Sequence, residues 1–414
     1  MSAQAAHDLD TAALTAPNGG LAAALFAAAR RQPRRTVLRD AGDRTAWNGR
    51  PAITWTYEAA AEIVGRLARG IVAWRLPAGS CIGLGFAGGA EASLAHLAVE
   101  AAGHIPCPLS PVWDADALSA AIESGKLAGI LTEGRRGSRR PAEEFAQAAI
   151  RLYGLRFIAA FGPGLPDGVI SLDAMALERG VMAPEPSRGL VTFAGGDPRR
   201  PVYRAADALD AAVAAHLERL PGTERILTLL PPHDLRGLVT GLGTALASGA
   251  MLETLIPFDT LAFQATLSRP VPTRLVIPAA FEAAVAGMTL PWTVRAIDVV
   301  HRPPVRLPEP SARDFNGPPR LDVLVLDEDA ILTRPRGRWH IPVDDPKAAV
   351  ADEPVQGPAL ARRVGDGRLL CHGVASRAAL LHCGEHNLKE VSRPRETTYR
   401  ALHAGDKLMV VPVR

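Results

Sequence analysis

The sequence predicts an α/β protein built from two doubly wound, mostly parallel sheets packed with helices, followed by a small β-rich third lobe. Three observations support this fold class. Short apolar runs alternate with amphipathic helix patterns from about residue 20 to residue 161, which is typical of βαβ units. The same alternation restarts at residue 187. Beyond about residue 290, prolines accumulate and short β-like pieces follow one another without long helices between them.

In the first unit, the apolar periodicity predicts helices over residues 20–32, 57–74, 91–102 and 115–124. Strands are expected at residues 36–38, 52–55, 81–86, 105–109, 129–132 and 156–161. Thr56 is placed to cap the second of these helices. Glu58 near its start and Arg69 near its end suit the helix dipole.

The second unit repeats this order with strands expected at residues 225–230, 251–256 and 274–277 and helices at residues 205–220, 237–247 and 261–267. The third lobe is expected to hold β-like pieces at residues 323–326, 338–343, 368–372 and 407–413. The predicted subdomains are therefore residues 1–186, 187–300 and 301–414.

Composition excludes several classes of protein. The chain has 414 residues, of which 48% are hydrophobic and 21% charged, as expected for a soluble protein with a large core. Its net charge of +3 is too balanced to predict nucleic-acid binding. No apolar run is long enough for a membrane span, and the N-terminus lacks the basic start of a signal peptide. Four cysteines without a C-x-x-C pair indicate reduced thiols and a cytoplasmic protein.

The stretch SRGLVTFAGGDPRRPVYR, residues 187–204, has the outline of a phosphate-binding loop. A strand-like run leads into Gly195 and Gly196, two arginines follow, and a helix is expected from residue 205. Glycines let backbone N–H groups approach an anion, and a helix N-terminus carries about half a positive charge. However, no serine, threonine or lysine lies between Phe193 and Arg204. The loop therefore lacks most of the usual phosphate ligands.

Two other motifs suggest different functions. Residues 83–88, GLGFAG, match the G-x-G-x-x-G pattern of dinucleotide sites, which would indicate a nicotinamide- or flavin-dependent oxidoreductase. The glycines fall inside the expected strand, and no acidic residue ends the following strand, so this is the weaker alternative.

A second group contains Cys371, His372, His382, Cys383 and His386, residue types that bind zinc. Its spacing matches no known zinc motif, and strand-core cysteines with surface histidines are the alternative.

A third motif, PPHDLRG at residues 231–237, lies between the end of an expected strand and the start of a helix. Ligands bind at such strand ends in open α/β sheets. His233 and Asp234 could therefore contact a ligand, or Asp234 could simply cap the helix. The sequence leaves both readings open. Motifs of hydrolase elbows, zincins and P-loops do not occur.

Together these stretches resemble the large N-terminal domain of the adenylate-forming superfamily, which includes acyl- and aryl-CoA synthetases, luciferases and adenylation domains. The opening unit, from TWTYEAAAEIVGRLARGIVAW through AAGHIPCPLSPVWDADAL, is similar to that family's first α/β unit. The family phosphate loop, T-S-G-T-T-G-x-P-K-G, falls on residues 192–201. Its P-P-x-H-x-Y-G segment falls on residues 231–237, and its Y-G-x-T-E motif on residues 324–328.

The resemblance implies site residues at these positions. Nucleotide-binding candidates are Thr192, Ala194, Gly195, Gly196, Arg200 and Asp406, the last within a Gly405-Asp406 pair that is similar to a ribose-binding motif. Catalytic candidates are Arg200, in the place of the family lysine, and Glu328, which would also be the Mg²⁺ ligand. His233, Asp234 and Gly237 are the acyl-pocket candidates.

The resemblance also implies ATP or AMP, Mg²⁺ and coenzyme A as cofactors, and a carboxylic acid or acyl thioester as ligand. The family's mobile C-terminal domain would begin near residue 414, so a partner protein supplying that domain is expected.

The departures from the family motifs weaken the expected chemistry. Phe193, Gly195 and Gly196 replace hydroxyl residues of the phosphate loop, and Asp197 replaces a glycine. Hydrogen bonds to charged groups contribute about 1.5–3 kcal/mol each, so losing two or three would weaken triphosphate binding by orders of magnitude. Arg199 is a candidate to neutralise Asp197. The sequence thus predicts a synthetase-like protein with doubtful activity on its own, and the alternative is a non-catalytic scaffold or regulatory subunit.

Overall fold

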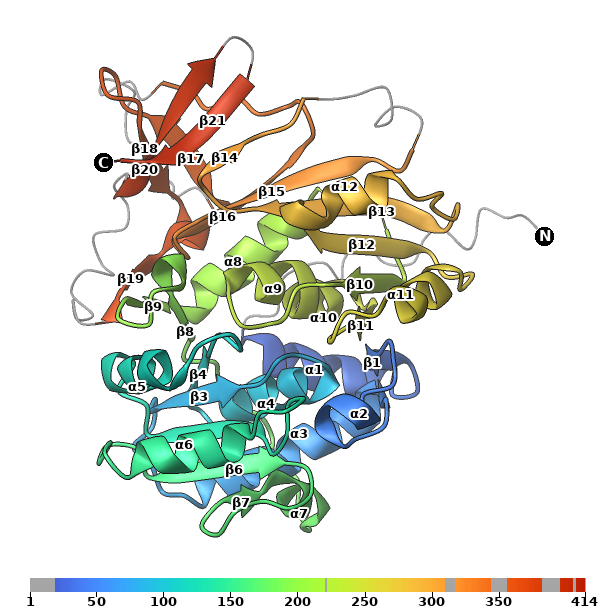
Figure 1. Ribbon diagram of the computed structural model, residues 1–414, viewed down its shortest axis with the longest axis vertical. Coiled ribbons are helices and arrows are strands. Elements are labelled where there is room, and N and C mark those ends of the chain that lie inside the picture. Colours follow the sequence, from blue (N-terminus) through green and yellow to red (C-terminus); the bar gives the residue numbers. More distant parts are fainter. Residues whose placement is uncertain are drawn as a thin grey trace.

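A computed structural model describes residues 19–219, 222–309, 317–343, 356–381, 395–404 and 407–413, and it confirms the predicted α/β fold class. Figure 1 shows a smaller sheet with its helices in the lower half of the molecule and a larger sheet in the upper half. A β-rich lobe lies beside the larger sheet. None of the helices within these ranges is long and apolar enough to cross a membrane.

The smaller sheet is parallel, with the strand order β4-β3-β5-β6-β7. Its strands are β3 (Cys81–Gly85), β4 (Ile105–Pro108), β5 (Gly129–Glu133), β6 (Phe157–Phe161) and β7 (Ile170–Ser171). The chain places β4 on one side of β3 and then crosses to the other side for β5, which makes the sheet doubly wound. The associated helices are α3 (Tyr57–Val72), α4 (Ala90–Ala101), α5 (Ala115–Ser124), α6 (Pro141–Ala149) and α7 (Leu172–Leu177). Thr56 caps α3 as predicted, because its hydroxyl accepts the Ala59 N–H at 3.3 Å.

The larger sheet has eight strands in the order β16-β15-β13-β12-β10-β11-β1-β2. They are β1 (Thr36–Asp40), β2 (Thr54–Thr56), β10 (Arg225–Thr228), β11 (Met251–Thr254), β12 (Thr273–Pro278), β13 (Val294–His301), β15 (Arg320–Leu326) and β16 (Ala330–Pro335). The pairs β1–β2 and β15–β16 at its two edges are antiparallel, and the other pairs are parallel. Strands from the start and the end of the chain therefore join the central ones in one sheet. The subdomain limits at residues 186 and 300 remain a prediction.

Two further sheets complete the fold. The β-rich lobe contains an antiparallel sheet in the order β14-β21-β20-β18-β17. Its members are β14 (Val305–Arg306), β17 (Ala359–Arg362), β18 (Arg368–His372), β20 (Arg395–Ala404) and β21 (Lys407–Pro412). A three-stranded sheet in the order β19-β9-β8 joins β8 (Leu190–Phe193), β9 (Pro201–Arg204) and β19 (Ala378–Leu380).

The main hydrophobic core lies among the helices between the smaller sheet and the larger sheet. It contains buried residues of α1 (Leu21–Arg31), α3, α4 and α8 (Ala206–Leu217) together with residues of both sheets. The expected helix at residues 237–247 consists of α9 (Leu235–Gly237), a π-helical segment (Leu238–Gly243) and α10 (Thr244–Ser248). The remaining α-helices in the described ranges are α2 (Thr45–Asn48), α11 (Thr260–Leu267) and α12 (Glu282–Ala286).

Candidate active site

The glycine-rich stretch forms a β-hairpin, which corrects the strand–loop–helix layout expected from the sequence. Strands β8 and β9 pair antiparallel, with Phe193 opposite Pro201 and Leu190 opposite Arg204. Helix α8 begins at Ala206, after the second strand rather than directly after the loop. Pro201 instead begins β9, so a strand of four residues lies between the loop and the helix. The helix dipole is therefore not aimed from the end of this loop.

The hairpin loop is held in one shape by local hydrogen bonds. Gly195 and Gly196 have φ values of 62° and 75°, which favour glycine. The Asp197 carboxylate accepts the Arg199 backbone N–H at 2.9 Å. This contact, rather than an ion pair with the Arg199 side chain, satisfies the acid. From the smaller sheet's side, Trp113 Nε1 donates to the Gly196 carbonyl at 3.3 Å, and Ser124 Oγ donates to the Pro198 carbonyl at 2.6 Å.

This loop has few groups that could bind an anion. Gly195 and Gly196 are exposed, and a Cβ added at Gly196 would meet no atom within 4 Å. Arg200 is half-buried, and no ion pair within the described ranges joins its guanidinium to an acid. Thr192 is 2% exposed in β8, so its side chain lies in the sheet rather than at the loop surface. A phosphate there would meet glycine backbone and Arg200, without the hydroxyl donors of the family loop.

Residues 231–237 lie at the carboxyl end of β10 and hold a buried acid. Asp234 is 4% exposed, and its Oδ1 accepts the Gly237 N–H at 3.1 Å, so it caps α9. Its Oδ2 accepts Arg236 Nη2 at 2.6 Å and lies 3.4 Å from His233 Nε2. Gly237 has a packing role here, since an added Cβ would lie 2.1 Å from the Pro231 carbonyl oxygen. Asp234 therefore both caps the helix and joins a charged cluster.

The second acid of this cluster is Glu328, which follows β15. It is 1% exposed, and its Oε2 accepts the Leu235 N–H at 2.7 Å. Its Oε1 accepts a hydrogen bond from Arg302, which lies directly after the carboxyl end of β13. The same Arg302 Nη2 contacts Asp234 Oδ2 at 3.2 Å. Parallel strands β10, β13 and β15 thus bring residues from three distant stretches to one edge of the sheet, where ligands bind in open α/β folds.

The turn that carries Glu328 is connected to the glycine hairpin. Asp327 and Glu328 both have positive φ values, 44° and 62°, which are costly for residues with side chains. Arg204, 1% exposed at the end of β9, donates to the carbonyl oxygens of Glu328 and Asp329 at 2.7 and 2.9 Å and also to the Ala375 carbonyl. The Asp327 carboxylate accepts the Tyr399 hydroxyl at 2.7 Å. An added Cβ at Gly195 would lie 3.6 Å from Asp327 Oδ1, so the hairpin and the turn adjoin.

Burial and neighbouring charge set the protonation of this cluster. Burial raises the pKa of Glu328, and the adjacent Asp234 charge raises it further against the opposing effect of Arg302. Burial alone would raise the pKa of Asp234 as well, but the surrounding cationic groups hold it below its usual range. Burial lowers the pKa of His233, which favours the neutral imidazole. Asp234 is thus the more acidic of the two carboxyls.

The predicted Mg²⁺ site does not fit the cluster. Mg²⁺ needs oxygen ligands in near-octahedral geometry, whereas the positively charged Arg302 guanidinium already lies against both Glu328 Oε1 and Asp234 Oδ2. Within the described ranges, no group of three or more His, Cys, Asp or Glu side chains could hold a metal ion. Of the zinc candidates, Cys371 is buried in β18, whereas His382, Cys383 and His386 lie outside the described residues.

The structure brings together most of the sequence candidates but adds residues that the sequence analysis missed. Thr192, Ala194, Gly195, Gly196 and Arg200 belong to the hairpin, and His233, Asp234, Gly237 and Glu328 to the adjoining cluster. Gly405 and Asp406 lie outside the described residues. Arg204, Arg302, Asp327 and Tyr399 were missed. The signal for Arg302 was its place after the apolar run 294–301, a strand that the sequence analysis did not predict.

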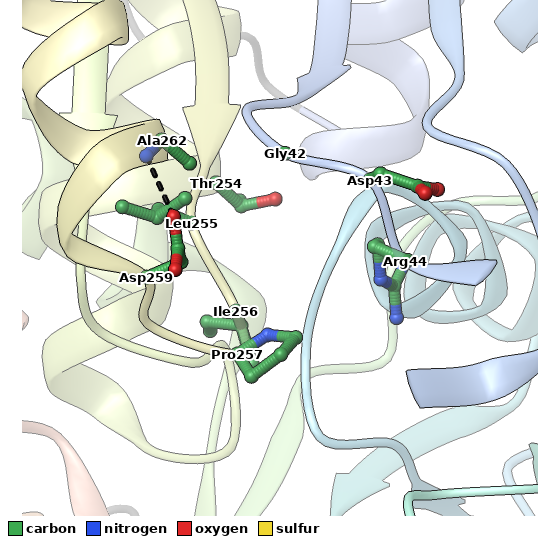
Figure 2. Close-up of a pocket in the computed structure, with 9 residues that line it drawn as sticks. All are labelled: Gly42, Asp43, Arg44, Thr254, Leu255, Ile256, Pro257, Asp259 and Ala262. Atoms are coloured by element: carbon green, nitrogen blue, oxygen red, sulfur yellow. Dashed lines mark hydrogen bonds between the residues drawn. The ribbon is translucent and has the colours of Figure 1, made fainter. Parts of the chain in front are cut away.

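The glycines of the dinucleotide-like motif at residues 83–88 make room for protein side chains. Added Cβ atoms at Gly83, Gly85 and Gly88 would lie 2.8, 2.5 and 2.5 Å from side-chain atoms of Leu127, Phe145 and Ile256, respectively. Ile256 belongs to the wall of a 270 Å³ pocket at the ends of β1 and β11, opposite Arg44, as Figure 2 shows. Gly83 and Gly85 therefore allow close packing within the smaller-sheet half, and Gly88 allows close packing against Ile256, which follows β11 of the larger sheet.

Comparison with known proteins agrees with this architecture. Residues 25–156 match the family model described as AMP-binding enzyme. No curated protein sequence matches the chain significantly.

Among solved structures, the chain is similar to the luciferase-like enzyme of the mealworm Zophobas morio (11% identity, 96% of both chains covered, TM-score 0.72). It is also similar to apo MbtA of Mycobacterium smegmatis (18% identity, 100% of this chain and 79% of that one, TM-score 0.68). A third similar structure is ATP-bound MatB of Rhodopseudomonas palustris (15% identity, 96% of this chain and 79% of that one, TM-score 0.69). The chain thus has the fold of the large N-terminal domain of adenylate-forming enzymes, and its residues 25–156 are similar to the AMP-binding enzyme family.

Proposed function

We propose that this chain is an acyl- or aryl-CoA synthetase-like protein that binds a carboxylic acid, its acyl-adenylate or its CoA thioester, and that uses ATP poorly. The observation that carries this proposal is the cluster of Asp234, Arg302 and Glu328 beside the glycine hairpin. It occupies the carboxyl ends of the larger sheet, where the fold binds ligands. In the family, a carboxylate attacks the α-phosphate of ATP, and a thiol then takes the acyl group.

The chain's own residues suit anion binding better than phosphoryl chemistry. Arg200 in the hairpin has no described acidic partner, and Arg236 and Arg302 keep 17% and 29% of their side chains exposed beside the buried acids. These cations would attract and orient a carboxylate or a single phosphate, because guanidinium groups bind both in a fork geometry. The loop without hydroxyls, with Asp197 adding a negative charge, disfavours a triphosphate. Positioning and charge stabilisation of phosphates are the main contributions of such enzymes.

ATP–pyrophosphate exchange across a panel of carboxylic acids tests this proposal. Exchange at ordinary ligase rates by the chain alone would refute poor ATP use. Calorimetry with AMP, ATP and acyl-CoA should show AMP or the acyl compound bound more tightly than ATP. Binding of none of these compounds would refute the ligand class.

A non-catalytic scaffold or regulatory subunit is the second candidate, and one observation favours it. The acids at the sheet edge are satisfied by hydrogen bonds within the chain, so the fold does not depend on a ligand there. Tight capture of a single protein partner at native concentration, together with absent or millimolar binding of nucleotide and acyl-CoA, would favour this candidate.

A further inference from the structure

One nitrogen of Arg302 bridges the two buried acids of the candidate site. Arg302 Nη2 lies 3.2 Å from Asp234 Oδ2 and donates to Glu328 Oε1. The carboxylates come from different strands, and no other described cation contacts both of them. Mg²⁺ in proteins is bound through one or two carboxylates, so Arg302 lies where such an ion could bind.

Every oxygen of the two carboxylates has a protein partner. Asp234 Oδ1 accepts the Gly237 N–H, and Oδ2 accepts Arg236 and Arg302. Glu328 Oε2 accepts the Leu235 N–H, and Oε1 accepts Arg302. A metal ion placed between Glu328 Oε1 and Asp234 Oδ2 would have to displace Arg302, which holds both oxygens. Since Asp234 and Glu328 are 4% and 1% exposed, water cannot readily replace a lost partner.

The charges of the cluster also argue against a bound divalent metal ion. With both acids ionised, Asp234 and Glu328 are matched by Arg236 and Arg302, so the cluster is neutral without a metal. Adding a divalent cation would leave an excess of two positive charges in a buried place, which is costly. Removing Arg302 would leave one uncompensated negative charge, with Glu328 Oε1 without its donor and Asp234 Oδ2 held by Arg236 alone.

We propose that Arg302 is the resident cation of this site: it takes the place that a divalent metal would hold between Asp234 and Glu328, and anion binding here is independent of Mg²⁺. The metal part of this inference stands on the cluster alone. The anion part rests on the proposed function.

The test measures binding of Mn²⁺, a spectroscopic substitute for Mg²⁺, by electron paramagnetic resonance. The wild type should leave low-millimolar Mn²⁺ free. The variant Arg302→Met should bind one ion per chain at least about tenfold more tightly, and adding Glu328→Gln to it should abolish that gain. Arg295→Met is the matched control, because Arg295 is an exposed arginine on the same strand β13, and it should behave as the wild type.

Stability measurements keep the test decisive if Arg302→Met folds poorly. In that case, Mn²⁺ should raise the thermal midpoint of the variant and leave that of the wild type unchanged, and Arg302→Lys should fold without metal. Stoichiometric Mn²⁺ binding by the wild type that Glu328→Gln removes would overturn the proposal. A folded Arg302→Met variant that binds no Mn²⁺ would overturn it as well.

A second arm compares AMP affinity with Mg²⁺ and with a chelator. Affinities equal within about twofold are expected, and a strong loss with the chelator would overturn metal independence. If AMP and acyl ligands do not bind at all, the proposed function fails, but the Mn²⁺ result still decides the role of Arg302.

Discussion

Replacing Arg204 with methionine should destabilise the protein strongly, because this fully buried side chain connects three separate segments. Its guanidinium donates to the carbonyls of Glu328, Asp329 and Ala375, whereas the side chain itself comes from β9. Methionine fills a similar volume but leaves three acceptors without this donor. Hydrogen bonds to a charged group contribute about 1.5–3 kcal/mol each, so partial relaxation still leaves an expected loss of about 3–6 kcal/mol.

Urea denaturation followed by circular dichroism measures this loss as a shift of the first unfolding transition. Because a chain of this size need not unfold in two states, midpoints of matched variants are compared. Arg199→Met is the control: Arg199 is exposed in the same hairpin, and a change below about 0.5 kcal/mol is expected. A loss below about 1 kcal/mol for Arg204→Met would refute the reasoning, since it would mean that water satisfies these carbonyls.

Three further predictions follow from buried charge, close packing and the hairpin. Burial raises the pKa of Glu100 from 4.5 to about 7. The folded state therefore holds this proton more tightly, and its contribution of about 3 kcal/mol is present below pH about 4.5 and lost as the pH rises through about 7. Urea midpoints at pH 5 and 8 should differ less for Glu100→Gln than for the wild type, and an unchanged difference would contradict this. Gly88→Ala should cost about 1–3 kcal/mol, because its φ is 144° and the new Cβ would lie 2.5 Å from Ile256 Cδ1. The variant Ile256→Val, which lacks that atom, should recover part of the loss, and equal losses in both backgrounds would exclude this contact as the cause. Asp197→Asn keeps the acceptor for the Arg199 N–H but removes a negative charge beside the hairpin, so AMP and ATP should bind about three- to tenfold more tightly by calorimetry. Unchanged affinity would place the phosphate elsewhere.

Much of the fold could be predicted from the sequence because its signals are local. The strands at residues 81–86, 105–109 and 129–132 and the helix at residues 115–124 were expected within one or two residues of β3, β4, β5 and α5. Apolar periodicity and the Thr56 cap act over a few residues and leave a readable pattern. The hairpin was misread because Pro201–Arg204 is a short strand whose partner, β8, lies across a loop.

The sequence by itself determined the order of the elements, the fold class and the loss of hydroxyl groups from the phosphate-loop stretch. Only the tertiary structure decided which residues of the site contact one another. Arg204, Asp234, Arg302 and Glu328 are separated by up to 124 residues, and their pairing depends on which strands lie side by side. The energy of a charge also depends on burial, which sequence patterns do not give. Glu328 could therefore be picked out as an acid from its motif, whereas its engagement by Arg302 and the Leu235 N–H follows only from the fold.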